Sequence, residues 1–153
     1  MGAVEIVDAS RAHVGRIARR MRASDLKECR AKGREPAPAL RYSLASSQFA
    51  LTVLIDGTPH AMFGVTPYSL ADGVGRPWFL GSDEVYRHPR EMIVKGGMVV
   101  DIMQDSFRRL ENVVSADNLP AIRMLRRWGF EVGVEAHEVG GVAFLPFWRS
   151  AHV

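Results

Sequence analysis

The stretch from Asn118 to Phe130 constrains the fold more than any other part of the chain. It predicts a short helix with signals at both ends. Asp117 or Asn118 can cap the first turn, because a side-chain oxygen accepts a free backbone N–H there. Pro120 suits the first helical positions, where its missing N–H costs little. Gly129 is a typical helix terminator, so the helix should end just before it.

Apolar runs flank this helix on both sides and are expected to form strands. One covers residues 110–114, and the other covers residues 130–139. A further apolar run over residues 142–148 is expected to pair with the second strand across Gly140-Gly141. The second half of the chain is therefore predicted to be a strand, a helix and a terminal hairpin.

The rest of the chain continues an α/β pattern. Asp56-Gly57 lies between two strand-like runs, which is a strong hairpin signal. Gly96-Gly97 interrupts the longest helical pattern, and we expect a kink, a break or a close approach there. The expected strands cover residues 3–7, 49–55, 60–67 and 77–80, the expected helices cover 11–21, 25–31, 40–47 and 89–109, and a loop is expected at 35–38. Residues 1–153 are thus predicted to form a single domain with a mixed, mostly antiparallel sheet of about six to seven strands and helices on both faces.

Composition limits the functional classes. The chain of 153 residues has a net charge of +3, and no apolar run approaches the ~20 residues of a membrane span. Its single cysteine, Cys29, excludes an internal disulfide and indicates a reducing compartment; we expect a surface thiol in a cytoplasmic protein. Arginines concentrate in residues 11–30 and 108–127, but no nucleic-acid-binding motif accompanies them, so nucleic acid is not the expected partner. The histidines lack metal-ligand spacing, and no metal site is expected.

Asn118, Ala121, Ile122, Gly129 and Phe130 are spaced as in the C-terminal half of the GNAT superfamily of N-acetyltransferases, which this chain resembles. The resemblance implies a GNAT-like fold and acyl-CoA-dependent acetylation of a primary amine on a small molecule or a protein. In that superfamily the fourth strand diverges from the fifth and acetyl-CoA lies in the gap. Backbone amides at the start of the central helix bind its pyrophosphate.

The same resemblance implies a set of site residues. It places Asn118 and Ala121 beside the coenzyme A arm. A base that deprotonates the amine is expected at Asp83 or Glu84. The arginines expected near the phosphates are Arg87, Arg90, Arg123, Arg126 and Arg127.

Two positions depart from the superfamily pattern. Residues 81–92 lack the glycine-rich loop that normally contacts the pyrophosphate. Leu125 stands where many members have a tyrosine that protonates the departing thiolate, and leucine has no proton to donate. Both departures favour an alternative in which the chain keeps the fold and lacks catalysis.

A narrower resemblance supports that alternative. The segments 78–82, 110–118 and 123–130 are similar to small GNAT-like bacteriophage proteins related to the internal virion protein of T7-like phages. That likeness implies a structural, assembly or host-interaction role, with phage or host proteins as partners and the host cytoplasm or the virion as the location. Separately, an exposed aromatic strand over residues 144–148 would offer an edge to a second copy, so a homodimer is a further hypothesis.

Overall fold

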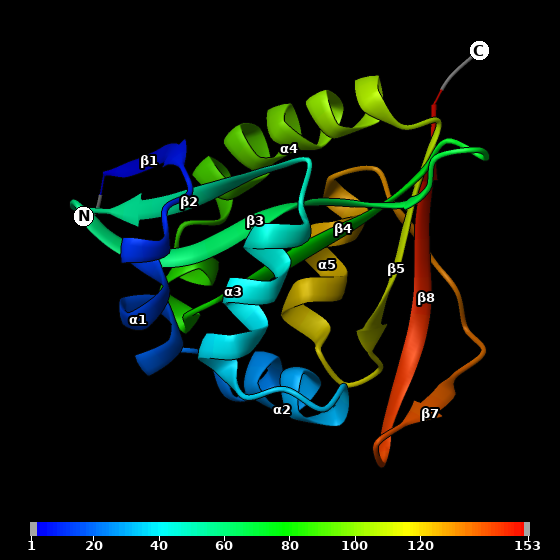
Figure 1. Ribbon diagram of the computed structural model, residues 1–153, viewed down its shortest axis with the longest axis horizontal. Helices are drawn as coiled ribbons and strands as arrows, with labels where there is room; N and C mark the ends of the chain where they lie inside the picture. Colours follow the sequence, from blue (N-terminus) through cyan, green and yellow to red (C-terminus); the bar gives the residue numbers. More distant parts are fainter. Residues whose placement is uncertain (1–2, 152–153) are drawn as a thin grey trace.

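The structure, a computed structural model, describes residues 3–151 and contains one mixed sheet of eight strands (Figure 1). The strand order is β1-β2-β3-β4-β5-β8-β6, and β7 pairs with the outer side of β8. All neighbouring strands are antiparallel except β4 and β5, which are parallel. The strands are β1 (Val4–Asp8), β2 (Phe49–Ile55), β3 (Thr58–Ser69), β4 (Val74–Gly81), β5 (Arg109–Ser115), β6 (Glu131–Val132), β7 (His137–Val139) and β8 (Val142–Ser150).

The α/β class and the helices on both faces agree with the prediction, but the number of strands is higher. The strand expected over residues 130–139 is split into β6 and β7. Gly133 still donates its N–H to the Pro146 carbonyl, but a Cβ at this position would lie 2.8 Å from Pro146 Cγ. The chain leaves the sheet immediately afterwards, and Val134 is 95% exposed.

The helices are α1 (Arg11–Arg19), α2 (Ala23–Ala31), α3 (Pro36–Ser46), α4 (Pro89–Ser106) and α5 (Leu119–Arg127), with a 3-10 helix η1 (Asp83–Arg87) before α4. The loop expected at residues 35–38 is wrong, because α3 begins at Pro36. Proline is tolerated in a first turn, where no intrahelical N–H bond is lost. Helix α4 runs without a break through Gly96, which instead allows Trp128 to approach: a Cβ at Gly96 would lie 2.3 Å from Trp128 Cζ2.

Alternate residues of β3 separate two apolar clusters on opposite faces of the sheet. Phe63 and its neighbours Ala61 and Val65 pack against α4 and α5 in the larger cluster. Met62 points the other way and packs against Val14, Ile17 and Leu40 of α1 and α3. The sheet is therefore covered on both sides.

Two expectations about exposure are wrong. Cys29 is 5% exposed, because α2 packs it toward the interior. Phe144 and Phe147 are also buried, and β8 lies between β5 on one side and β6 and β7 on the other. The premise of an exposed aromatic edge for homodimer formation is thus removed. None of the helices within residues 3–151 is both long and apolar enough to span a membrane.

Candidate active site

Strands β4 and β5 are joined only where they begin. Their parallel pairing covers Val74 with Arg109 and Gly75 with Leu110, and beyond these residues the strands diverge toward α2 (Figure 1). A cavity of about 710 Å³ lies between them, lined by both strands and by α2, α3 and α5. We call this opening the strand gap. Its volume is in the range of small-molecule sites.

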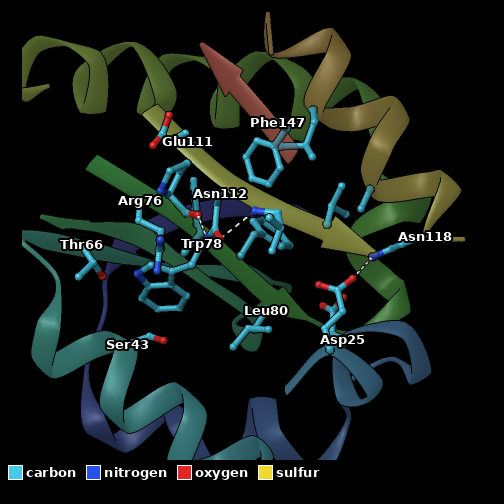
Figure 2. Close-up of a pocket in the computed structure, with 18 of the residues that line it drawn as sticks. Asp25, Ser43, Thr66, Arg76, Trp78, Leu80, Glu111, Asn112, Asn118 and Phe147 are labelled. Atoms are coloured by element: carbon cyan, nitrogen blue, oxygen red, sulfur yellow. Dashed lines mark hydrogen bonds between the residues drawn. The ribbon is translucent and has the colours of Figure 1, made fainter. Parts of the chain in front are cut away.

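Asn112 bridges the narrow end of the strand gap (Figure 2). Its Nδ2 donates to the Pro77 carbonyl at 2.8 Å, and its Oδ1 accepts the Val113 N–H at 2.8 Å. These are backbone groups that a continuous sheet would pair with each other. The bridge therefore satisfies the first peptide groups left open where the ladder ends.

Two carboxylates of α2 occupy the wide end. Asp25 Oδ2 accepts the Gly81 N–H at the end of β4, at 2.9 Å. Glu28 Oε2 accepts the N–H and the hydroxyl of Ser115 at the end of β5, at 3.3 and 2.8 Å. Residues three apart in a helix lie on one face, so α2 spans the opening and holds both strand ends. Glu28 Oε1 has no hydrogen-bond partner within residues 3–151, and Glu28 lines the cavity.

Between these two ends, β4 presents free backbone groups to the gap. Gly81 directs its N–H to Asp25 and its C=O to the Arg22 N–H, away from β3. Because hydrogen-bonding directions alternate along an antiparallel strand, Phe79, two residues earlier, turns its N–H and C=O to the same side. The pairing with β5 has ended by this point, so these groups face the cavity.

A buried polar cluster closes the wide end. Arg22, which is 7% exposed, donates from Nη1 to Asp25 Oδ1 at 3.1 Å and to Asn118 Oδ1 at 2.9 Å. Asn118 is 2% exposed and donates from Nδ2 to Glu28 Oε2 at 2.9 Å. Asn118 is the N-cap residue of α5, as predicted, but its side chain makes no capping bond. It joins α2 to the start of α5 instead.

Burial controls the protonation of this region. Burial raises the pKa of Asp25 to about 7, although the Gly81 N–H and the Arg22 charge both act to lower it. Burial also raises the pKa of the Cys29 thiol to about 11, and the carboxylates of Asp25 and Glu28 add to this effect. Cys29 is thus held as an unreactive thiol.

The residues predicted as a base lie on η1. Asp83 is 71% exposed and lies 3.4 Å from Arg22 Nε, through Oδ1. Glu84 pairs with Arg87. Neither carboxylate lines the strand gap, and their catalytic role stays a prediction. Within residues 3–151, no cluster of His, Cys, Asp and Glu side chains is arranged to hold a metal ion.

The predicted cofactor residues fall into three groups. Asn118 and Ala121 line the strand gap. Arg123 and Arg127 line a second cavity of about 240 Å³ between the start of α4 and α5. The two cavities share Tyr86 and Met124 as lining residues. Three arginines of the predicted set line neither cavity: Arg87, Arg90 and Arg126.

Helix η1 takes the place of a glycine-rich loop. Ser82 caps η1 by accepting the Glu84 N–H at 3.2 Å, and the chain then enters α4 at Pro89. The amides of Arg90 and Glu91 belong to the first turn of α4, where helical N–H groups lack intrahelical partners. They remain suited to binding an anion beside the second cavity.

Sequence reasoning missed Asp25, Glu28 and Asn112. Asp25 and Glu28 carried a local signal, since two carboxylates three residues apart share one helix face. Asn112 carried none, because its role depends on the divergence of two strands that are far apart in the sequence.

No sequence model of a protein family matches the chain, and no curated protein matches it in sequence. Solved structures do match in fold. Ard1 from Thermoplasma volcanium superposes with a TM-score of 0.74 at 13% identity, covering 99% of both chains. A GCN5-related N-acetyltransferase from Kribbella flavida gives a TM-score of 0.69 at 16% identity, covering 97% of this chain and 98% of the other.

A third match is AAC(6')-Ib, whose structure contains ribostamycin and coenzyme A. It gives a TM-score of 0.67 at 14% identity, covering 97% of this chain and 93% of the other. The fold is therefore that of the GNAT acetyltransferases, over essentially the whole described chain.

Proposed function

We propose that this protein transfers an acetyl group from acetyl-CoA to a primary amine in the strand gap. The main support is the divergence of β4 from β5, which leaves the backbone of Phe79 free to hydrogen-bond a ligand between the strands. A closed sheet would pair these backbone groups with each other, so packing alone gives no reason for the opening. The open groups are better explained as a binding site than as a packing solution.

The residues present fit coenzyme A. Arg123 and Arg127 supply positive charge for its phosphates in the second cavity, and the first amides of α4 add donors there. The second cavity adjoins the strand gap at Tyr86 and Met124, so a long ligand can extend from one into the other. When bound, acetyl-CoA supplies an acetyl group activated as a thioester.

Glu28 is the proposed general base. Its Oε2 is fixed by Ser115 and Asn118, which orients the carboxylate, and Oε1 is left to accept a proton. The amine nitrogen forms a bond to the acetyl carbon, the carbon–sulfur bond breaks, and the amine proton passes to Glu28. The Phe79 N–H is positioned to stabilise negative charge on an oxygen in the gap.

Tyr86 offers a donor where Leu125 cannot. It lines both cavities, and burial raises the pKa of its hydroxyl well above the ordinary value. The hydroxyl therefore stays protonated at neutral pH and can donate a hydrogen bond to a departing sulfur.

Calorimetric titration with acetyl-CoA is the first test. We expect binding that weakens about ten-fold or more in Arg123→Gln and Arg127→Gln, because each loses a charge-assisted contact to phosphate. Arg126→Gln is the control. The sequence resemblance predicts that Arg126 also lies near the phosphates, but its side chain does not line the second cavity, so this variant should bind acetyl-CoA as the wild type does. No binding of acetyl-CoA at millimolar concentration would refute the proposal.

Glu28→Gln tests the chemical step. We expect acetyl-CoA affinity to stay close to that of the wild type while the transfer rate falls about 10²- to 10⁴-fold, the usual contribution of a positioned base. Asp83→Asn and Glu84→Gln test the alternative base on η1. A loss of rate confined to those two variants would move the base from α2 to η1.

One observation favours a second candidate, a catalytically silent protein with a structural, assembly or host-interaction role of the kind implied by the phage resemblance. Helix η1 replaces the glycine loop, and its Asp83 and Glu84 add negative charge close to where a pyrophosphate would bind. Absence of acetyl-CoA binding, combined with a stable fold, would favour this role.

A further inference from the structure

Three basic residues lie at the mouth of the strand gap, on the α2 and α3 side. Lys32, Arg34 and Arg76 all line the cavity. None of the three lies within ion-pairing distance of a carboxylate in the described part of the chain. We call these residues the cationic rim. It lies on the face of β4 that carries Arg76, Trp78 and Leu80, opposite the face that packs against α4 and α5.

All three cations lie over aromatic rings, and Lys32 Nζ lies 5.2 Å from the centroid of the Phe144 ring. The Arg34 guanidinium lies 3.7 Å from the centroid of the Tyr42 ring, and that of Arg76 lies 4.1 Å from the Tyr68 ring. Such stacking orients a guanidinium without cancelling its charge, so its donors stay available for an anion.

The third cation, Lys32, lies close enough to other charged groups for them to change its pKa. Partial desolvation lowers the pKa of the Lys32 ammonium although the residue as a whole is exposed; Glu28 raises it, and the positive charge of Arg76 lowers it further. A nearby like charge disfavours the charged form of Lys32, and a bound anion would relieve this repulsion.

Two of the nearby acids are bound to arginines outside the rim. Glu111 is bound by Arg109, through Nε at 2.6 Å, and Asp25 is bound by Arg22. Glu28, beside Asn118 at the α2 end of the cavity, forms no ion pair within residues 3–151. Figure 2 shows Arg76 and Glu111 at one end of the cavity and Asp25 and Asn118 at the other. Arg76 thus lies at the opposite end of the cavity from the polar cluster that contains Glu28, whereas Lys32 lies one helical turn from Glu28.

We propose that the acceptor is a small amine that carries its own anionic group, a carboxylate or a phosphate. The ammonium end would lie toward Glu28 and the anion at the cationic rim. This inference rests on the proposed function, because it names the substrate class of the same site. An amine without an anion would leave the rim unsatisfied, and an acidic molecule without an amine would leave Glu28 unpaired.

Matched acceptor pairs test the charge requirement. Ligand-observed NMR would measure binding of ω-amino acids from glycine to 6-aminohexanoate against alkylamines of equal chain length. Phosphoethanolamine against ethanolamine distinguishes a phosphate from a carboxylate. We expect the anionic member of at least one pair to bind about ten-fold more tightly. Equal or tighter binding of every neutral partner, or binding of none, would overturn the proposal.

Variants locate the preference on the rim. Arg76→Gln and Arg34→Gln should remove the difference within the best pair and leave binding of the neutral amine unchanged. Arg41→Gln is the matched control, since Arg41 is an exposed arginine of α3 that does not line the cavity. Equal loss in Arg41→Gln would mean a general charge effect and would contradict the rim. Acetyl-CoA titration of the same variants is separate: intact binding without any anion preference refutes this inference alone.

Discussion

The α4 and α5 face of the central sheet and the open end of the sheet that α2 covers, here called the α2 face, are stabilised in different ways. On the α4 and α5 face, apolar side chains pack in one continuous cluster, in which the Trp128 ring lies 6.4 Å from Phe63 and 6.0 Å from Phe79. On the α2 face, beside the strand gap, charged and polar side chains are buried together, with Arg22 between Asp25 and Asn118.

Apolar packing and buried polar contacts should respond differently to the loss of a side chain. An apolar cluster loses stability gradually as atoms are removed, because each atom contact contributes little energy. A buried polar cluster is held only when every member has its partner, because a single unpaired charge is expensive in a low dielectric. The α2 face should therefore respond to single substitutions more abruptly than the α4 face does.

The largest expected effect is on the α2 face. Arg22→Met removes the partner of the buried Asp25 and one partner of Asn118, and it should lower the free energy of unfolding by about 3–5 kcal/mol. Denaturant titration measures this loss. Arg20→Met, an exposed neighbour, should change stability by about 0.5 kcal/mol or less. Similar losses in the two variants would remove the contrast between the faces.

The next effect tests how tightly the α4 face is packed. Gly96→Ala places a Cβ 2.3 Å from Trp128 Cζ2, and this overpacking should cost about 1–3 kcal/mol. In Gly97→Ala the nearest atom, Trp128 Cδ1, is 3.6 Å away, so the better helix propensity of alanine should stabilise the protein by up to about 1 kcal/mol. Thermal unfolding of both variants gives opposite shifts, and a gain in Gly96→Ala would show that the Trp128 contact is loose.

The smallest effect is a pH dependence confined to the α2 face. Asp25 keeps its proton up to about pH 7 in the folded chain, whereas its ordinary pKa is 3.8. Between these values the folded state binds more protons, so Asp25 makes stability fall as pH rises, by about 1 kcal/mol or less from pH 6 to pH 7. Its favourable contribution is complete below the unfolded pKa and is lost through pH 7.

Asp25→Asn should flatten this slope, because the amide cannot ionise. Denaturant titrations at pH 6 and pH 7 measure it in both proteins. An unchanged slope in the variant would assign the pH dependence to another group.

The sequence predicted the α4 and α5 face better than the α2 face. The spacing of Asn118, Gly129 and Phe130 is a local pattern, and a helix between two strands follows from it. The role of the Asn118 side chain does not follow, because its partners Arg22 and Glu28 lie 96 and 90 positions earlier. Local capping rules predict that this side chain bonds the first turn of α5. In the structure it bonds Arg22 and Glu28 instead.

Charge was harder to interpret than periodicity. Arg22 belongs to an arginine-rich stretch that reads as an exposed surface, yet it is buried by partners that only the fold brings to it. The carboxylates on η1 are predicted as the base because they follow the fourth strand. The carboxylates that face the cavity come instead from α2, which lies much earlier in the chain. Sequence position relative to an expected motif is a weak guide to which acid enters a site.

The divergence of β4 and β5 also bears on solubility. A sheet that opens in its middle has two additional strand edges, and free edges are templates for pairing with other chains. Here Asn112, Asp25 and Glu28 occupy the exposed peptide groups at both ends of the opening, which leaves only a short unpaired stretch around Phe79. The side chains that line the strand gap thereby also protect the molecule from edge-to-edge aggregation.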